Sequence, residues 1–414
     1  MPWYEPRHAA VRESAAAPPN MTRPIALLLA FAAAFLSACS SVPRIPTEGV
    51  GPERAMWVTR FDYRTREDVE RIVDDCANAK IDTILFQVRG NATASYKSKL
   101  EPWGEQFGFQ DPGFDPLGVA LERAHAKGLR LHAWVNAIPA WWGTTPPSDP
   151  RQVWNAHPEW TWFDQNGERQ RFSEKFYVSL NPCLPEVRAY VVEVVRDLAI
   201  HYPVDGVHLD YIRFPNEPPA TPKGLDYPRD ERTVGLFRAA TGKDPAKDKP
   251  AWDAWRAAQV TQLVRDIRAM LKQARPRATL SAACGPIPEK ALKEHFQDVR
   301  TWLTEGLLDV VYPMNYAADF ATWTQRARIW TEIAGNTKVV MGIMAGGRDA
   351  EAHRAFLDAG RRMFDGWSLF AYAKIFDSRA DVQDKTTDEA KFERSQLRKA
   401  LVPILREQAG PSGG

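Results

Sequence analysis

Eight strand-like segments alternate with eight helix-like segments in this 414-residue chain, and this alternation constrains the fold more than any other feature. Alternating strands and helices are typical of parallel sheets. Eight such units in a chain of this length favour an α/β fold of the closed (β/α)8 kind, the TIM barrel, over an open doubly wound sheet. The short apolar segments predict strands at 55–60, 82–88, 129–136, 205–211, 278–284, 308–314, 338–344 and 367–373. The patterns between and after them predict helices at 66–80, 115–127, 185–201, 253–274, 289–304, 320–334, 349–363 and 387–407.

Three connections are too long to be ordinary loops between a strand and a helix. Residues 90–114 follow the second predicted strand, 137–184 follow the third, and 214–251 follow the fourth. Segments that follow the carboxyl ends of barrel strands all rise over one face, which is the face that carries active sites. We therefore expect long loops after strands 2, 3 and 4, forming a cleft for an extended ligand.

Residues 204–215 (VDGVHLDYIRFP) carry the clearest functional signal. Gly206, His208 and Asp210 alternate with apolar or aromatic residues, which is the period of a strand. Asp210 stands where this strand ends, the position at which a parallel barrel keeps its chemistry. We therefore predict that Asp210 is a catalytic carboxyl group rather than one half of a structural salt bridge.

The same alternation in the second and third strands turns Arg89, Trp134 and Asn136 inward, beside His208. Such a polar cluster fits a carbohydrate site, because sugar hydroxyls need fixed donors and acceptors. The competing interpretation of Arg89 is that it neutralises a neighbouring acid. The complete set of predicted substrate-binding residues adds side chains from the segments after the strands and comprises Arg89, Tyr96, Trp103, Trp134, Asn136, His208, Tyr211, Arg213, Asn315 and Tyr316.

Hydrolysis of a glycosidic bond usually needs a second carboxyl group. We predict Asp319, which follows the sixth strand, for this role. The sequence leaves four alternatives open, namely Glu217, Glu101, Asp62 and Asp226. Substrate-assisted attack by an N-acetyl group would need no second carboxyl at all.

The N-terminal residues read as targeting information rather than as part of the fold. Residues 21–38 combine a basic start, a short apolar run and a small-residue end, as a signal peptide does. The sequence Leu-Ser-Ala-Cys at 36–39 resembles a bacterial lipobox, which predicts lipidation of Cys39. Ser40 after this cysteine favours the outer membrane, on its periplasmic side, in a Gram-negative cell. We assign 1–20 to an upstream extension, 39–53 to a tether, 54–405 to the barrel and 406–414 to a flexible tail.

Several classes of protein are disfavoured by charge and by missing motifs. The formal net charge is only +2, which argues against a nucleic-acid partner held by a strong positive field. The chain has no phosphate-binding glycine loop, no His-Glu-x-x-His and no Gly-x-Ser-x-Gly. We expect neither a cofactor nor a resident metal.

With these residues in hand, the chain resembles the bacterial glycosyl-hydrolase-10-like family, whose members include a peptidoglycan-directed hydrolase of the division machinery. The resemblance is dense over 54–215 and rests on the motifs at 55–59, 84–89, 94–98, 101–103, 115–117, 132–136, 180–182, 185–188 and 205–215. It implies a (β/α)8 barrel that acts on glycans, with Asp210 as its catalytic carboxylate. Many relatives carry two consecutive acids at this strand end, whereas Tyr211 stands second here.

The leading hypothesis is a lipid-anchored glycoside hydrolase that cleaves a cell-envelope polysaccharide, the glycan strands of peptidoglycan. Its partners would be that glycan, the membrane through the Cys39 anchor, and cell-wall or division proteins. One alternative is a non-catalytic glycan-binding protein of the envelope. The other is a metal-dependent polysaccharide deacetylase, which would need a His/Asp ligand cluster beyond His208 and Asp210.

Overall fold

The computed structural model describes residues 51–216 and 220–409. The upstream extension, the signal segment, Cys39, most of the tether, Glu217 and residues 410–414 lie outside the described residues. Within 51–216 and 220–409, none of the helices combines the length and the apolar character that a membrane crossing requires.

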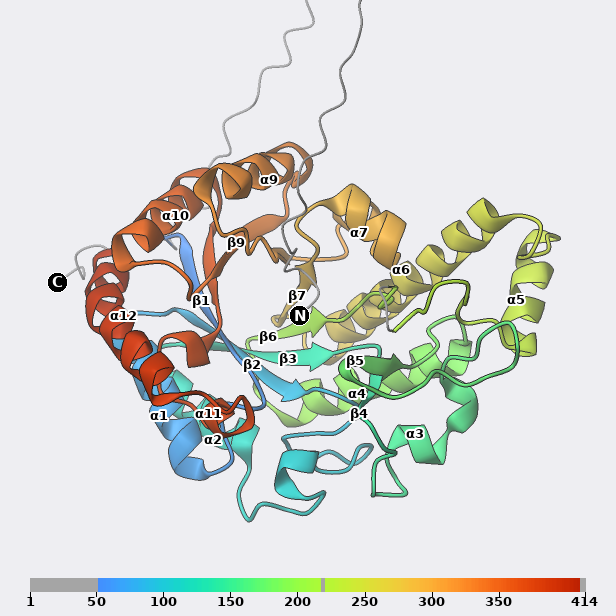
Figure 1. Cartoon of the computed structure of the whole chain (residues 1–414), viewed down its shortest axis with the longest axis horizontal. Coiled ribbons are helices and arrows are strands. Elements are labelled where there is room, and N and C mark those ends of the chain that lie inside the picture. Colours follow the sequence, from blue (N-terminus) through green and yellow to red (C-terminus); the bar gives the residue numbers. More distant parts are fainter. Residues whose placement is uncertain (1–50, 217–219, 410–414) are drawn as a thin grey trace, which may run out of the picture. The chain divides into compact units, whose positions relative to one another are not determined.

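Eight parallel strands form a closed barrel in the order β1-β10-β9-β8-β7-β6-β3-β2 (Figure 1). This confirms the predicted TIM barrel, with each barrel strand within about three residues of the range expected from its apolar run. The barrel strands are β1 (Glu53–Val58), β2 (Thr83–Arg89), β3 (Arg130–Asn136), β6 (Gly206–Asp210), β7 (Thr279–Cys284), β8 (Val310–Pro313), β9 (Lys338–Met344) and β10 (Gly366–Phe370).

Helices surround the barrel, and the longer ones bury apolar side chains (Figure 1). In the first of them, Val69, Ile72, Val73 and Cys76 are buried at helical spacing, and Thr65 forms a capping box with the third helical residue. The helices are α1 (Arg66–Asn78), α2 (Pro116–Ala126), α3 (Val153–Ala156), α4 (Pro185–His201), α5 (Glu231–Thr241), α6 (Lys249–Ala274), α7 (Pro288–His295), α8 (Val299–Thr304), α9 (Phe320–Ile333), α10 (Ala350–Met363), α11 (Ala380–Gln383) and α12 (Asp388–Glu407).

The structure differs from the predicted elements in one helix and in the long connections. The segment 289–304 forms two helices, because Phe296 adopts a left-handed conformation and the side chain of Asp298 caps a new helix. The connection after β3 contains an antiparallel hairpin of β4 (Pro139–Gly143) and β5 (Ser173–Ser179), which no strand prediction covered. The expected connection 214–251 contains α5 and the first residues of α6, whereas α12 agrees with the helix predicted at 387–407.

The interior of the barrel is filled in layers by side chains of neighbouring strands. In the register between β3 and β6, His132 pairs with Gly206, Trp134 with His208, and Asn136 with Asp210. Gly206 is required in the lowest layer, because a Cβ atom there would approach the His132 ring to 2.7 Å. The predicted inward direction of these side chains is therefore correct, and the uppermost layer places Asp210 at the mouth.

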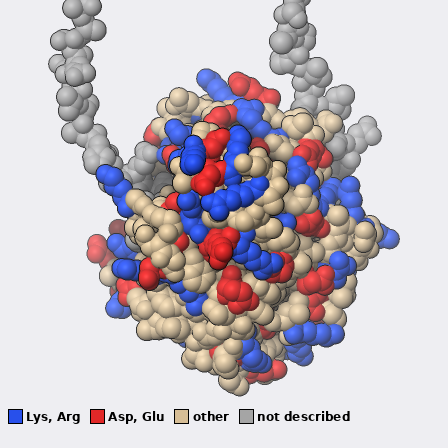
Figure 2. Space-filling view, turned by 90° about the vertical axis from the view of Figure 1, so that its right-hand side faces the viewer, with Lys and Arg blue, Asp and Glu red and all other residues tan. Residues whose placement is uncertain are grey.

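The surface carries charges of both signs. On the face shown in Figure 2, Lys and Arg side chains are interspersed with Asp and Glu side chains. This distribution agrees with the small net charge of the chain. A mixed surface of this kind does not generate the single-signed field that steers nucleic acids.

Candidate active site

Asp210 ends strand β6 and is a buried carboxyl group at the mouth of the barrel. The residue is only 6% exposed, and its Oδ1 accepts a hydrogen bond of 2.7 Å from the backbone N–H of Tyr211. Burial raises the pKa of Asp210, while the nearby charge of Arg213 and hydrogen bonds from Tyr211 and Trp134 act in the opposite direction without cancelling that effect. A carboxyl group in this state holds its proton more tightly than an exposed aspartate does.

Trp134 and Asn136 support Asp210 from the adjacent strand. The indole N–H of Trp134 donates to Oδ1 of Asn136 at 2.9 Å, and the Asn136 amide donates to the Gly90 carbonyl at 2.9 Å. Trp134 also packs edge-to-face on Trp57, with ring centroids 4.9 Å apart. Both predicted binding residues therefore have protein partners that fix the upper layer of the barrel.

Tyr211, Arg213 and Tyr316 surround the exposed side of the Asp210 carboxyl. Tyr211 is half-buried and adopts a left-handed conformation with φ of 46°, which is costly for a residue with a Cβ and typical of functional sites. The Arg213 guanidinium lies 4.8 Å from the centre of the Tyr211 ring. Burial and the charge of Asp210 together raise the pKa of the half-buried Tyr316 well above its ordinary value, so this phenol stays a hydrogen-bond donor. These three predicted residues do gather around Asp210.

Arg89 does not point into the barrel as predicted. The pairing of β2 with β3 shifts by one residue between Gln87 and Arg89, and this bulge turns Arg89 to the side of Val135, which faces the helices. There Arg89 forms a buried ion pair with Glu101, with Nη2 2.7 Å from Oε1. The alternation of the sequence cannot show such a bulge.

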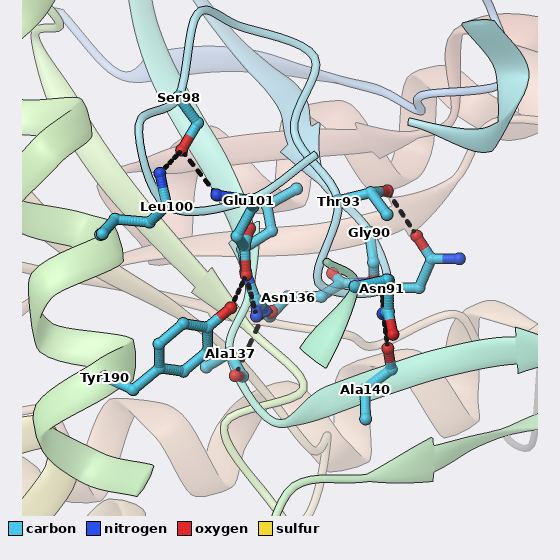
Figure 3. A network of polar contacts seen from close by, with 12 residues as sticks. Gly90, Asn91, Thr93, Ser98, Leu100, Glu101, Asn136, Ala137, Ala140 and Tyr190 are labelled. Atoms are coloured by element: carbon cyan, nitrogen blue, oxygen red, sulfur yellow. Dashed lines mark hydrogen bonds and ion pairs between the residues drawn. The ribbon is translucent and has the colours of Figure 1, made fainter. Parts of the chain in front are cut away.

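The Arg89–Glu101 pair belongs to an enclosed polar network, shown in Figure 3. The Tyr190 hydroxyl of α4 donates to Glu101 Oε1 at 2.6 Å, and Arg89 also donates to the backbone carbonyls of Asn136 and Ala137. Burial alone would lower the pKa of Arg89, but the Glu101 carboxylate raises it above its ordinary value. The network ties β2, β3 and α4 together, so the interpretation of Arg89 as the neutraliser of an acid is correct.

Three further predicted binding residues are enclosed by protein. Tyr96 is buried against Tyr202, with ring centroids 5.7 Å apart. His208 lies below the mouth, where its Nδ1 is 2.9 Å from Ser281 Oγ and burial lowers its pKa well below the ordinary value. The Asn315 amide donates to the Trp323 carbonyl at 2.9 Å. All three side chains are buried, and their role in binding stays a prediction.

Trp103 remains at the edge of the loop that follows β2. It is half-buried and lies edge-to-face on Phe107, with ring centroids 6.2 Å apart. Its role in binding stays a prediction.

Asp319 is placed at the start of α9, away from the barrel interior. Its exposed carboxylate accepts a hydrogen bond of 2.8 Å from Thr322 N–H, and this backbone bond lowers the pKa of Asp319. A helix cap with a lowered pKa is a poor proton donor. The geometry gives Asp319 a structural role, and a catalytic role for it stays a prediction without support from its surroundings.

The other candidates for a second carboxyl group also have structural partners. Glu101 is held by Arg89, as described above. Asp62 is fully buried, and burial raises its pKa to about 6 against hydrogen bonds from Ser378 and Thr59. Asp226 accepts hydrogen bonds from Arg256 at 2.8 Å and from Trp252 at 3.0 Å. None of these three contacts the Asp210 carboxyl through a recorded hydrogen bond.

The structure also brings residues to the mouth that the sequence patterns did not single out. Arg60 follows β1, and its guanidinium donates to the Tyr177 hydroxyl at 3.1 Å and lies 3.5 Å from Glu105. Tyr177 belongs to the unpredicted strand β5, and its ring meets Tyr211 at 5.0 Å. The position of Arg60 at the end of a predicted strand was a usable signal, whereas Tyr177 had none without the hairpin.

The alternative function, a metal-dependent polysaccharide deacetylase, would require a metal centre. In the parts of the chain that the structure describes, His, Cys, Asp and Glu side chains nowhere gather in groups of three that could hold an ion. The arrangement around Asp210 instead offers one proton-holding carboxyl, one guanidinium and phenol groups.

The sequence of this chain is similar to a known protein family and to two named proteins. The sequence model of the family described as Glycosyl hydrolase-like 10 matches residues 52–351. The glycosyl hydrolase DigH of Escherichia coli K12 is 24% identical over 351 residues, covering 73% of this chain and 74% of DigH. The glycosyl hydrolase YngK of Bacillus subtilis is 26% identical over 295 residues, covering 64% of this chain and 54% of YngK.

Solved structures agree on the fold. The glycoside hydrolase domain of PgaB (BpsB) from Bordetella bronchiseptica superposes with a TM-score of 0.59 at 12% identity, over 84% of this chain and 99% of that domain. The catalytic domain of β-amylase from Paenibacillus polymyxa gives 0.57 at 10% identity, over 85% of this chain and all of that domain. From the match over most of the barrel and the carboxyl group at the end of β6, the chain belongs to the Glycosyl hydrolase-like 10 family.

Proposed function

We propose that this protein is a lipid-anchored glycoside hydrolase that cleaves the glycan strands of peptidoglycan, with Asp210 as its proton donor. Membership of a glycosyl hydrolase family supports the reaction class. The named relatives DigH and YngK, both described as glycosyl hydrolases, support it further. The choice of peptidoglycan among envelope polysaccharides rests on the family resemblance of the sequence motifs and on the envelope-targeting pattern at 21–39.

The observation that carries the proposal is the state of the Asp210 carboxyl. It lies at the catalytic face of the barrel, it is buried, and burial raises its pKa. A general acid works best when its pKa approaches the working pH, because it must be protonated at the start and release its proton easily. Asp210 would donate this proton to the glycosidic oxygen as the bond to the anomeric carbon breaks. The oxygen of a water molecule would then bond to the anomeric carbon, and the proton lost by that water would return to the Asp210 carboxylate.

Tyr211, Arg213 and Tyr316 fit the role of substrate-binding groups around this acid. Their hydroxyl and guanidinium groups can donate to sugar oxygens, and their rings offer apolar surface to the C–H faces of a sugar. Arg213 also limits the rise in the pKa of Asp210, since a nearby positive charge favours the carboxylate. This opposing effect is smaller than that of burial, so the pKa of Asp210 stays above its ordinary value.

The test measures release of reducing ends from purified peptidoglycan glycan strands by the wild-type protein and by Asp210→Asn. We expect the substitution to abolish release while binding of the strands, measured by sedimentation, is retained. Release by the variant at the wild-type rate would overturn the assignment of Asp210. Binding without hydrolysis in both proteins would favour the non-catalytic glycan-binding alternative.

The anchor is a separate part of the proposal. Cys39 follows Leu-Ser-Ala, and Ser40 after it favours the outer membrane on its periplasmic side. Expression in a Gram-negative host with labelled palmitate should yield labelled protein in the outer-membrane fraction. The Cys39→Ala variant should lose both the label and the membrane association, and an unlabelled wild-type protein would refute the anchor.

A further inference from the structure

We propose that the outer face of the β4–β5 hairpin continues the active site as a track of aromatic subsites for a glycan chain several sugars long. The aromatic track consists of Phe61, Trp142, Tyr177 and Tyr211, and it leads from Asp210 across the barrel mouth. This inference rests on the proposed function, because it describes how the same site would hold its substrate. It implies cleavage within long chains rather than removal of terminal sugars.

The two faces of the hairpin have different surroundings. In the register of β4 with β5, Trp141 pairs with Val178, and both side chains are buried in the core. Trp142 packs on Phe61, and Tyr177 contacts Arg60 and Tyr211, so both side chains lie on the side of the hairpin that meets the segments after β1 and β6. Both are half-buried rather than enclosed. The hairpin therefore buries Trp141 and Val178 and leaves the rings of Trp142 and Tyr177 partly exposed.

The rings of the track form two contacting pairs between the hairpin and Asp210. Trp142 meets Phe61 edge-to-face, with ring centroids 6.1 Å apart. Tyr177 meets Tyr211 in the same way at 5.0 Å. Tyr211 directly follows Asp210 and donates its backbone N–H to that carboxyl. The track therefore reaches the residue that directly follows Asp210.

Arg60 joins the two halves of the track. Its guanidinium carbon lies 4.2 Å from the centre of the Phe61 ring, and its Nη1 donates to the Tyr177 hydroxyl at 3.1 Å. The side chain is almost completely buried and packs over Gly90, where a Cβ atom would come within 2.4 Å of the guanidinium. A glycine at this strand end thus permits an arginine to fix Phe61 and Tyr177 in place.

The ligand chemistry follows from these side chains. The C–H faces of pyranose rings pack on aromatic faces, while hydroxyl groups at the ring edge need donors and acceptors. Half-buried rings that neighbouring groups hold in place lose little side-chain entropy when they bind. The Trp142 indole is held by a hydrogen bond of 2.9 Å to the Glu174 carbonyl. Such a track suits successive sugars of a neutral or N-acetylated backbone.

The experiment separates subsite binding from hydrolysis by using the Asp210→Asn protein. Titration calorimetry would measure its affinity for peptidoglycan glycan fragments, from a disaccharide to an octasaccharide. Adding Trp142→Ala should weaken octasaccharide binding about tenfold, the loss of one stacking contact, and leave disaccharide binding unchanged. Tyr177→Ala should act in the same direction. Trp142→Phe, which keeps a ring, should restore most of the affinity and shows that the loss is not a folding defect.

Trp255→Ala on α6 is the matched control, since Trp255 is also a half-buried tryptophan but packs against Trp252 on an outer helix. It should leave affinity for both fragments unchanged. Equal octasaccharide affinity with and without Trp142→Ala would overturn the track, whether or not the wild-type protein hydrolyses glycans. Length-dependent binding that requires Trp142, in a protein that shows no hydrolysis, would support the track and overturn the proposed reaction instead.

Discussion

Glu101 and Asp210 are both carboxyl groups buried at the mouth of this barrel, yet their surroundings differ. Glu101 receives two guanidinium nitrogens of Arg89 and the Tyr190 hydroxyl, so its negative charge is matched by donors at close range. Asp210 receives one backbone hydrogen bond at its Oδ1, and burial dominates its pKa. Glu101 therefore has partners that replace its hydration, as expected of a structural carboxylate, whereas Asp210 has fewer of them.

The difference follows from the cost of burying charge. A carboxylate removed from water is tolerated where a bidentate arginine and hydrogen bonds replace its hydration. Where the replacement is incomplete, the neutral acid is favoured and the pKa rises. One bulge in β2 produces this contrast, because it turns Arg89 toward Glu101 and away from the barrel interior, where Asp210 lies.

The largest expected effect comes from changing Asp210. Asp210→Asn keeps the shape of the side chain but removes its transferable proton, so glycan hydrolysis should fall by roughly 10³- to 10⁴-fold. Initial rates of reducing-end release, with the thermal midpoint measured in parallel, would test this. A Glu101→Gln protein that loses as much activity while keeping its stability would reverse the roles assigned to the two carboxyls.

Glu101→Gln should instead act on stability. It leaves the Arg89 guanidinium buried without a counter-charge, which costs about 3–5 kcal/mol of the free energy of unfolding. Urea denaturation would measure the loss. Glu186→Gln is the control, because the ion pair of Glu186 with Arg232 is largely exposed and should contribute less than about 1 kcal/mol. Similar losses in the two variants would show that the Arg89–Glu101 network is not special.

Trp134→Phe tests how much one hydrogen bond contributes to the pKa of Asp210. The Trp134 side chain lowers the pKa of Asp210, so its removal should raise that pKa further. An acid with a higher pKa stays protonated to higher pH, so the alkaline limb of the pH–rate profile should move upward. Activity below that limb should change by less than about tenfold, the value of one hydrogen bond. An unmoved or downward-shifted limb would contradict Asp210 as the titrating acid.

Asp319→Ala should have the smallest effect. It removes the cap of α9, for which about 1 kcal/mol of unfolding free energy is expected. Hydrolysis of glycan strands should be retained, because the side chain is exposed at a helix start. A loss of activity comparable to that of Asp210→Asn, in a folded Asp319→Ala protein, would restore Asp319 as the second catalytic carboxyl.

The candidate site could be predicted from the sequence only where strand periodicity was undisturbed. His208 and Asp210 point inward as their alternation required, and Asp210 was identified by its place at a strand end. The same reasoning failed for Arg89 because a single extra residue in β2 reverses the direction of everything after it. It also predicted that a ligand could reach His208 and Asn315, but both side chains are buried. A sequence pattern can show which way a side chain points, but it does not show what covers that side chain.

The barrel itself was determined by the sequence, because short apolar strands and amphipathic helices in alternation leave few other ways to bury both. Asp210 could be chosen for the same local reason. Only the tertiary structure decided that Glu101 belongs to Arg89, that Asp319 caps α9, and that Arg60 and Tyr177 meet beside Tyr211. These outcomes depend on contacts between residues far apart in the chain, where one bulge or one hairpin changes which side chains meet.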